Sequence, residues 1–473
     1  MVTYLVGMQH LDLIELVDKF AFYIENHTHH PKVISHSWDG KVRFVSLNGV
    51  VYTHILEYVL PKIAEMGYEL DLYDERVLDP IKHIEVTPDI FKNCLDKYNN
   101  PFQLREYQCK VANLLLKRGS GIVVAATSAG KGSIICAMSK VLIANRKKTI
   151  IVVPNTTLIT QTYEECKQFG LDVGEFSGTV KDLKHKVVVS TWQTLQNQPK
   201  ILQQFQAFIC DECHGSSSTI LFELLTEHCV HISLRFGVTG TMPKNDVKRF
   251  KVMSALGPVR YRITAKWLMD NGFISTIDIK NIILKESTDH SVFFNEYEAE
   301  VAYLTREDRI AALAEIINLL DLKYPTKNVL CLVNHKETGR TLTQMVPDSF
   351  YIDGDTKRKN RTATLDRYKN ADGLKGIATF GIASTGLSQD RIHFLILFDI
   401  GKSFIKVIQS IGRGLRKGGG KDHVTVLDVS SDLNFSMQHY TQRLAHYNEA
   451  EYPHKRYNLN IESLDVETLL KIL

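Results

Sequence analysis

Short runs of β-branched and other apolar residues alternate with longer amphipathic stretches from about residue 102 onward. Five such runs come first, at residues 121–127, 148–154, 186–191, 205–212 and 235–241. A second series follows, at residues 327–334, 349–355, 376–381, 392–400 and 423–430. Apolar runs of this length are typical of strands buried on both faces of a parallel sheet. The pattern therefore predicts two tandem, doubly wound α/β domains.

Residues 1–97 have a different pattern. Asp39-Gly40 and Asn48-Gly49 are strong hairpin-turn signals, and the stretch between them is rich in strand-forming residues. A helical pattern then starts at Thr53 and stops before Gly67, and Pro61 is expected to kink it. These signals predict a small N-terminal α/β module that ends near residue 97.

The composition is that of an ordinary globular protein. Of 473 residues, 44% are apolar and 23% are charged, which argues against a largely disordered chain. The formal net charge is +4, a total in which a local basic stripe can still be hidden. No run reaches the ~18 uninterrupted apolar residues of a membrane span. Eight scattered cysteines are typical of reduced thiols, so we expect a cytoplasmic protein with no membrane partner.

The first apolar run leads into a loop suited to binding phosphate. Its spacing, Ala125-x4-Gly130-Lys131, matches the phosphate-binding loop with alanine in place of the first glycine. Small residues let backbone N–H groups close around phosphates, and the following helix offers its N-terminus. The candidate nucleotide contacts are Thr127, Ser128, Ala129, Gly130, Lys131, Gly132 and Ser133. The loop predicts ATP with Mg²⁺ as its ligand, whereas a plain strand-to-helix turn is the alternative.

One position of this loop departs from the common pattern. Gly132 stands where serine or threonine usually binds Mg²⁺, and Ser133 comes next. The Gly-Lys-Gly-Ser order resembles the Gly-Lys-Gly-Thr loop of adenylate kinases. Ser133 is therefore the candidate hydroxyl ligand of the metal.

About 80 residues later, an apolar run ends in two acids, Asp211 and Glu212. This arrangement predicts that Asp211 binds Mg²⁺, often through water, and that Glu212 polarises the attacking water. A solvated acidic strand end is the alternative. The same residues form a Cys210-x-x-Cys213-His214 string, which is a haem-attachment signal in exported proteins. Nothing indicates export and no second ligand pair has zinc spacing, so we expect neither haem nor zinc.

A basic segment near the end of the second series has the residues of a phosphate-sensing helix. Gln409, Arg413 and Arg416 lie in the sequence QSIGRGLRKGGGK. Arginines three residues apart project from one face of a helix, and a planar guanidinium suits a phosphoryl group in transfer. The segment predicts catalytic arginines, and a solvated basic helix is the alternative.

Taken in order, these motifs resemble those of the DExH helicases of superfamily 2. The sequence LREYQ, with Arg105 and Gln108, resembles the adenine-recognising motif of that superfamily. Residues 125–133, 152–161, 188–195 and 211–214 resemble motifs I, Ia, Ib and II. Residues 238–243, 329–339, 378–390 and 409–416 resemble motifs III, IV, V and VI.

The resemblance implies ATP hydrolysis by two RecA-like motor domains, at residues 98–290 and 291–435, with a helical segment at 436–473. It assigns the coupling of nucleotide state to nucleic-acid contact to His214, Thr239 and Thr241, and a further nucleotide contact to Gly386. The segment 257–275 resembles the one that follows motif III in duplex-DNA motors such as the RecG, XPB and restriction-enzyme relatives. The short chain, the TSAGK, STWQT and DECH motifs and the small N-terminal module most resemble the UvsW-type helicases of bacteriophages, which would place the protein in the host cytoplasm.

In such motors the nucleic acid crosses both domains and is held mainly by its phosphates. Loops after strands and helix N-termini can donate to those phosphates. The candidate contacts are Pro154, Asn155, Thr156, Thr191, Trp192, Gln193, Thr379, Ser384, Thr385, Lys357 and Arg358. Because phosphate contacts carry no base code, we expect a preference for structure rather than for sequence. The N-terminal hairpins, with Trp38, Lys41 and Arg43, either grip duplex or junction DNA or form a structural cap.

The resemblance implies a monomeric, ATP-driven enzyme that remodels branched DNA in replication, recombination and repair. Its partners would be branched or duplex DNA, and an RNA–DNA hybrid where R-loops are resolved. Two alternatives stay open: an RNA helicase with the same motifs, and a nucleotide-gated binding protein with little hydrolysis, which Gly132 suggests.

Overall fold

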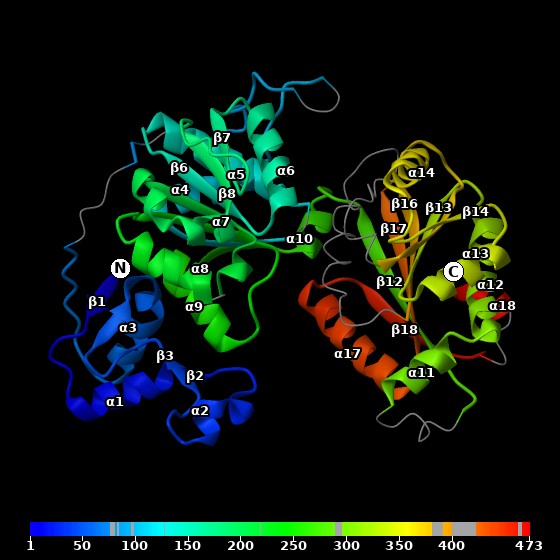
Figure 1. Cartoon of the computed structure of the whole chain (residues 1–473), viewed down its shortest axis with the longest axis horizontal. Helices are drawn as coiled ribbons and strands as arrows, with labels where there is room; N and C mark the ends of the chain where they lie inside the picture. The colour runs from blue at the N-terminus through cyan, green and yellow to red at the C-terminus, as the bar shows by residue number, and fades with distance from the viewer. Residues whose placement is uncertain are drawn as a thin grey trace. The chain divides into compact units, whose positions relative to one another are not determined.

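The computed structural model of the chain describes residues 1–75, 81–82, 85–95, 99–126, 128–217, 219–288, 296–380, 391–399, 422–461 and 466–473. The chain divides into two compact units (Figure 1). The first comprises residues 1–125 and 130–263, and the second comprises residues 126–129 and 264–473. Each unit is built around one seven-stranded sheet.

The sheet of the first unit is parallel throughout, in the order β11-β5-β10-β9-β6-β8-β7. Its strands are β5 (Ser120–Ala125), β6 (Thr149–Val153), β7 (Val173–Phe176), β8 (Val187–Thr191), β9 (Ala207–Asp211), β10 (Leu234–Thr239) and β11 (Val259–Ile263). Its helices include α4 (Glu106–Arg118), α5 (Lys131–Ala144), α6 (Thr156–Gln168), α7 (Trp192–Asn197), α8 (Thr219–Glu223) and α9 (Asp246–Leu256). Every residue of β6 and β8 is buried, which is why these strands are rich in valine and isoleucine and have no alternation of apolar and charged positions.

The sheet of the second unit is also parallel, in the order β14-β15-β13-β16-β17-β12-β18. Its strands are β12 (Thr276–Lys285), β13 (Asn328–Val333), β14 (Ser349–Ile352), β15 (Lys375–Thr379), β16 (Ile392–Phe398), β17 (His423–Ser431) and β18 (His454–Asn460). Its described helices include α10 (Ala265–Asp270), α11 (Tyr297–Leu304), α12 (Glu307–Lys323), α13 (Lys336–Met345), α14 (Arg358–Asn370), α17 (Asn434–Glu449) and α18 (Val466–Ile472). The predicted fold class, two doubly wound parallel α/β domains in tandem, is confirmed.

The N-terminal residues form a small α/β layer with two short antiparallel sheets, β1–β4 and β2–β3. Its elements are β1 (Val2–Tyr4), α1 (His10–Lys19), β2 (Ala21–Tyr23), α2 (Pro31–Ile34), β3 (Lys41–Arg43), β4 (Val50–Tyr52) and α3 (Leu56–Glu65). Gly49, with a φ angle of 71°, lies in the predicted hairpin turn, where the Ser46 N–H donates to the Val50 carbonyl. The hairpin predicted at Asp39-Gly40 is not found, because α2 lies between β2 and β3 and Gly40, with a φ angle of 80°, only leads into β3. A single 3-10 turn at Thr53–Ile55 precedes α3, and Pro61 lies inside that helix.

This N-terminal layer shares its hydrophobic core with the rest of the first unit. Phe250 of α9 lies at the junction, where its ring contacts Phe20, Phe22, Phe44 and Tyr58 at centroid distances from 4.8 to 6.0 Å. Ion pairs of 2.6 Å, Lys248–Glu25 and Arg260–Glu57, flank the contact. The layer is therefore packed as a structural part of the first unit, and its binding of DNA stays a prediction.

Each of the ten predicted strand runs holds a strand, but the two seven-stranded sheets also contain four described strands that were not expected: β7, β11, β12 and β18. β12 pairs with β17, so the second sheet begins before the boundary expected at 290/291, and the two units separate at 263/264. β18 lies in the C-terminal segment that was expected to be helical only. It is an edge strand that carries Lys455 and Arg456, and charged residues on an edge strand weaken its apolar signal.

Candidate functional site

The loop between β5 and α5 has the backbone of a tight phosphate-binding turn. Ser128 and Gly130 have φ angles of 71° and 76°, and the Ala129 N–H donates to the Ala126 carbonyl at 3.1 Å. A Cβ on Gly130 would lie 2.2 Å from Gln108 Nε2, so this position requires glycine for space as well as for conformation. Thr127 lies outside the described residues.

The start of α4 lies against this loop. The Arg105 backbone N–H donates to Gln108 Oε1 at 2.9 Å, an N-terminal capping arrangement that holds the buried Gln108 side chain in place. The Arg105 guanidinium donates to the Tyr107 hydroxyl at 3.1 Å. The fold therefore brings the predicted adenine-recognising residues and Gly130 together, although about 25 residues separate them.

The predicted catalytic lysine and acid meet directly. Lys131 Nζ lies 2.5 Å from Glu212 Oε1, and the two side chains are only 17% and 21% exposed. β9 ends at Asp211, and the Glu212 N–H then donates to Asp211 Oδ1 at 3.0 Å from a left-handed backbone with φ of 49°. The N-terminus of α5 and the carboxyl end of β9 thus form one polar cluster.

Burial and charge act differently on the two acids of this cluster. Burial raises the pKa of Asp211 to about 6, although the charge of Lys131 opposes the rise. Burial also acts to raise the pKa of Glu212, but the hydrogen bond with His214 and the charge of Lys131 lower it below its ordinary value. Glu212 is therefore ionised at neutral pH. A buried carboxylate next to a phosphate loop is a donor that fits Mg²⁺, a cation that prefers oxygen ligands.

The predicted coupling residues connect this cluster to the next strand. His214 Nδ1 lies 2.9 Å from Thr239 Oγ1, and that hydroxyl donates to the Thr241 carbonyl at 2.9 Å. The Gly240 N–H reaches Glu212 Oε2 at 3.4 Å. Since β9 and β10 are paired in the sheet, Glu212 lies beside the loop after β10 and is hydrogen-bonded to it.

The predicted nucleic-acid contacts of the first unit lie at the ends of β6 and β8. Asn155 caps α6 by accepting from the Leu158 N–H at 3.0 Å, and Thr191 caps α7 by accepting from the Thr194 N–H at 3.3 Å. Gln193 Nε2 donates to the Pro154 carbonyl at 3.3 Å and joins the two loops. Thr156 starts α6, and Trp192 starts α7 and packs half-buried against the core of the first unit.

Fewer of the predicted residues of the second unit can be placed. Thr379 is buried at the end of β15, and the exposed Lys357 immediately precedes α14. The side chain of Arg358 lies outside the described part of the chain. So do Ser384, Thr385, Gly386, Gln409, Arg413 and Arg416 in their entirety.

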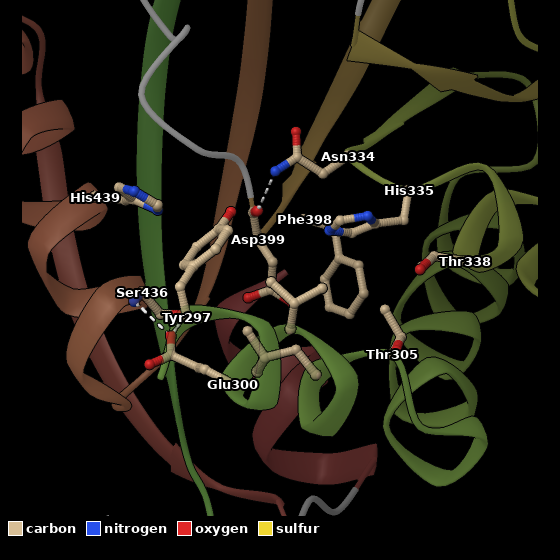
Figure 2. A pocket seen from close by; sticks show the side chains of 12 residues that line it. Tyr297, Glu300, Thr305, Asn334, His335, Thr338, Phe398, Asp399, Ser436 and His439 are labelled. Carbon is tan, nitrogen blue, oxygen red and sulfur yellow. Dashed lines mark hydrogen bonds between the residues drawn. The ribbon is translucent and has the colours of Figure 1, made fainter. Parts of the chain in front are cut away.

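A pocket that the sequence did not single out lies at the carboxyl ends of β13 and β16 (Figure 2). It is a small pocket of about 30 Å³, and α11, α13 and α17 supply its other walls. β13 has β15 on one side and β16 on the other, so the pocket sits where the winding of the sheet reverses, a usual ligand position in such folds.

The first turn of α13 borders this pocket. Asn334 Nδ2 donates to the Asp399 carbonyl at 3.3 Å, and His335 is the N-cap residue of α13. The Thr338 hydroxyl, in a residue that is 4% exposed, has no hydrogen-bond partner within the described residues. A helix N-terminus with an unpartnered hydroxyl is suited to binding an anion. The resemblance of residues 329–339 to helicase motif IV is the sequence feature that could have pointed to these pocket residues.

Two absences hold for the described residues. No helix there combines the length and the apolar character that crossing a bilayer requires. No three histidine, cysteine, aspartate or glutamate side chains there gather into a metal-binding group.

Comparison with known proteins gives matches to both units. The model of the type III restriction enzyme res subunit matches residues 101–244, and that of the helicase conserved C-terminal domain matches residues 308–418. The chain is 24% identical to the ATP-dependent DNA helicase uvsW of Enterobacteria phage T4, over 94% of this chain and 95% of that protein.

More distant relatives cover the central part of the chain. It is 26% identical to the DNA 3'-5' helicase XPB of Mycobacterium tuberculosis, over 67% of this chain and 59% of that protein. Among solved structures, the Hef helicase domain of Pyrococcus furiosus matches with a TM-score of 0.54 at 14% identity, over 72% of this chain and 98% of that one. This last similarity shows the fold.

Proposed function

The chain belongs to the superfamily 2 helicases and is an ATP-dependent enzyme that acts on nucleic acid, and from this premise we propose that it remodels branched DNA. Its substrates would be Holliday junctions, stalled forks, D-loops and R-loops. The observation that supports the use of ATP is the cluster of Lys131, Asp211 and Glu212 at the carboxyl edge of the first sheet. The end-to-end similarity to a DNA helicase of a phage supports DNA as the substrate.

The residues of the first unit suggest how ATP is used. Lys131 would leave Glu212 and bind the β- and γ-phosphates, because the triphosphate offers it more negative charge. Asp211 would hold Mg²⁺, which neutralises charge on the phosphates, and Ser133 is a second candidate for that role. Glu212, released from Lys131 and ionised, would then orient and deprotonate the attacking water.

Closure of the two units would complete the reaction. We assign Gln409, Arg413 and Arg416 to sensing and stabilising the transferred phosphoryl group. Thr239, Thr241 and His214 would report the nucleotide state to the nucleic-acid loops, since these residues are hydrogen-bonded around Glu212. In this scheme one ATP cycle is one opening and closing of the two units.

The nucleic-acid strand would be held by its phosphates. In the first unit the loops after β6 and β8, with Pro154, Asn155 and Thr191, are joined by the hydrogen bond from Gln193. In the second unit the first turn of α13, with Thr338, offers donors for a phosphate. Such contacts do not read bases, so the enzyme would select DNA by its branching and not by its sequence.

The test is a titration of ATP turnover against single-stranded DNA, duplex, fork, four-way junction, RNA–DNA hybrid and RNA. We expect the largest stimulation by forked and four-way DNA, and loss of turnover with retained DNA binding in Lys131→Ala. Stimulation by RNA alone would favour the RNA-helicase alternative. Junction processing that survives Lys131→Ala would favour a nucleotide-gated binding protein and contradict the proposal.

A further inference from the structure

The space at Gly132, where phosphate loops usually present a metal-binding hydroxyl, is filled by an acid. A Cβ on Gly132 would lie 2.1 Å from Glu165 Oε2 and 2.3 Å from Glu165 Oε1. No side chain fits at Gly132 while the carboxylate of Glu165 stays where it is. The glycine at 132 therefore lacks the usual hydroxyl and, for the same reason, leaves room for the carboxylate of Glu165.

Ser133 does not fill this space. Successive residues of a helix point about 100° apart, so a side chain at 133 cannot take the direction of one at 132. The Ser133 hydroxyl lies on the side of Gly130 that faces Gln108, 3.8 Å from the place of a Cβ on Gly130. Glu165 is the side chain that occupies the direction in which the usual hydroxyl would point.

The packing of two helices brings Glu165 to this place. α5 and α6 lie side by side in the first unit (Figure 1). Cys136, one turn after Gly132 on the same face of α5, has its sulfur 3.7 Å from that of Cys166, the residue after Glu165. Both cysteines are buried, so the carboxylate is presented to the first turn of α5 from a fixed helix. A negative charge at this helix N-terminus is also electrostatically favourable.

We propose that Glu165 replaces the missing loop hydroxyl and binds the hydration shell of the nucleotide-bound Mg²⁺, together with Asp211. This inference rests on the proposed nucleotide site and adds a residue to it. A carboxylate oxygen is a ligand of the class that Mg²⁺ prefers, and Mg²⁺ usually keeps several waters that such a group can accept from. In this arrangement a glycine is needed at position 132, because it leaves room for the carboxylate of Glu165.

The experiment is a double-mutant cycle of Gly132→Ser and Glu165→Ala in the full chain. Binding of a fluorescent ATP analogue is titrated against free Mg²⁺, and Mn²⁺ binding in the presence of ADP is followed by electron paramagnetic resonance. We expect Glu165→Ala to raise the Mg²⁺ and Mn²⁺ concentrations needed by about 10- to 100-fold, the usual effect of removing such a partner. Glu164→Ala, which removes the exposed neighbouring acid on the same helix, is the matched control and should leave both titrations unchanged.

The double variant carries the decisive result. Gly132→Ser alone should weaken metal-dependent binding because its side chain displaces the carboxylate of Glu165. Gly132→Ser/Glu165→Ala should recover most of the metal affinity that Glu165→Ala loses, because the hydroxyl then takes its usual place. If Glu165→Ala leaves metal affinity unchanged, or if the double variant binds metal no better than Glu165→Ala, the inference is wrong. Loss of ATP turnover in Lys131→Ala is scored separately, because it tests the nucleotide site itself and not the role of Glu165.

Discussion

Replacing Glu212 with glutamine should have opposite effects on ATP binding and on ATP hydrolysis. The substitution keeps the shape of the side chain and removes one negative charge, since the lowered pKa of Glu212 keeps it ionised at neutral pH. In the structure that charge holds Lys131 at 2.5 Å, with both side chains largely buried. ATP must therefore displace Glu212 from Lys131 before the lysine can bind phosphate.

The size of the gain in ATP affinity follows from this competition between Glu212 and ATP for Lys131. A hydrogen bond to a charged group contributes about 1.5–3 kcal/mol, which ATP must overcome to displace Glu212 from Lys131. A glutamine oxygen still accepts from Lys131, so the substitution removes only part of this cost. We take that part as about 1–2 kcal/mol, which corresponds to a roughly 5- to 30-fold gain in ATP affinity. Loss of the general base should at the same time lower kcat by about 10²- to 10⁴-fold.

The assay measures equilibrium binding of a fluorescent ATP analogue and DNA-stimulated phosphate release for wild type, Glu212→Gln and Lys131→Ala. Glu223→Gln, which removes an exposed acid on α8, is the control and should resemble wild type. Lys131→Ala should weaken ATP binding, whereas Glu212→Gln should strengthen it. If Glu212→Gln binds ATP as weakly as Lys131→Ala does, or hydrolyses it at the wild-type rate, the competition argument is refuted.

Three further substitutions test electrostatics and packing. Asp211→Asn should raise the free energy of unfolding at pH 8 by up to about 3 kcal/mol. Burial raises the pKa of Asp211 to about 6, so the ionised carboxylate destabilises the folded protein at pH 8 and the neutral amide does not. That gain should shrink as the pH falls from 6 to 4, where the wild-type carboxyl takes up its proton; denaturant titrations at several pH values measure it. Phe250→Ala should cost about 3–5 kcal/mol of stability and loosen the N-terminal layer, which hydrogen exchange of residues 1–66 would report; unchanged protection there would contradict the shared core. Arg309→Met should cost about 3–5 kcal/mol, because it leaves the buried carboxylate of Glu286 and the partly buried one of Asp399 without their common partner; an unchanged melting temperature would show that the pairs contribute nothing.

The packing at Phe250 changes what deletion of the N-terminal layer would measure. As an independent module, the layer could be removed to test its contribution to junction binding. In the structure, its removal exposes the apolar face of α9. Substitutions at the surface, at Trp38 or Lys41, are therefore the better test of DNA contact, although Trp38 already donates to the Lys41 carbonyl at 3.0 Å.

The sequence was sufficient to predict an element or a site residue wherever the signal lies in neighbouring positions of the chain. A buried parallel strand needs an apolar run, and a phosphate loop needs small residues before a lysine, so both are written in neighbouring positions. Asp211 and Glu212 could be placed at the end of a strand because they directly follow an apolar run. Lys131 and Glu212 were thereby predicted to face one site, and the structure brings them to 2.5 Å.

The tertiary structure decided everything that depends on which elements become neighbours. Nothing local to Glu165 marks it, because a glutamate on an amphipathic helix is usually a solvated surface residue; only the packing of α6 on α5 brings it to Gly132. The membership of β12 and β18 in the second sheet, and the merging of the N-terminal layer with α9, have the same origin. Local pattern sets the kind of element that a segment forms, whereas the surfaces that elements bury against one another depend on contacts between residues far apart in the chain.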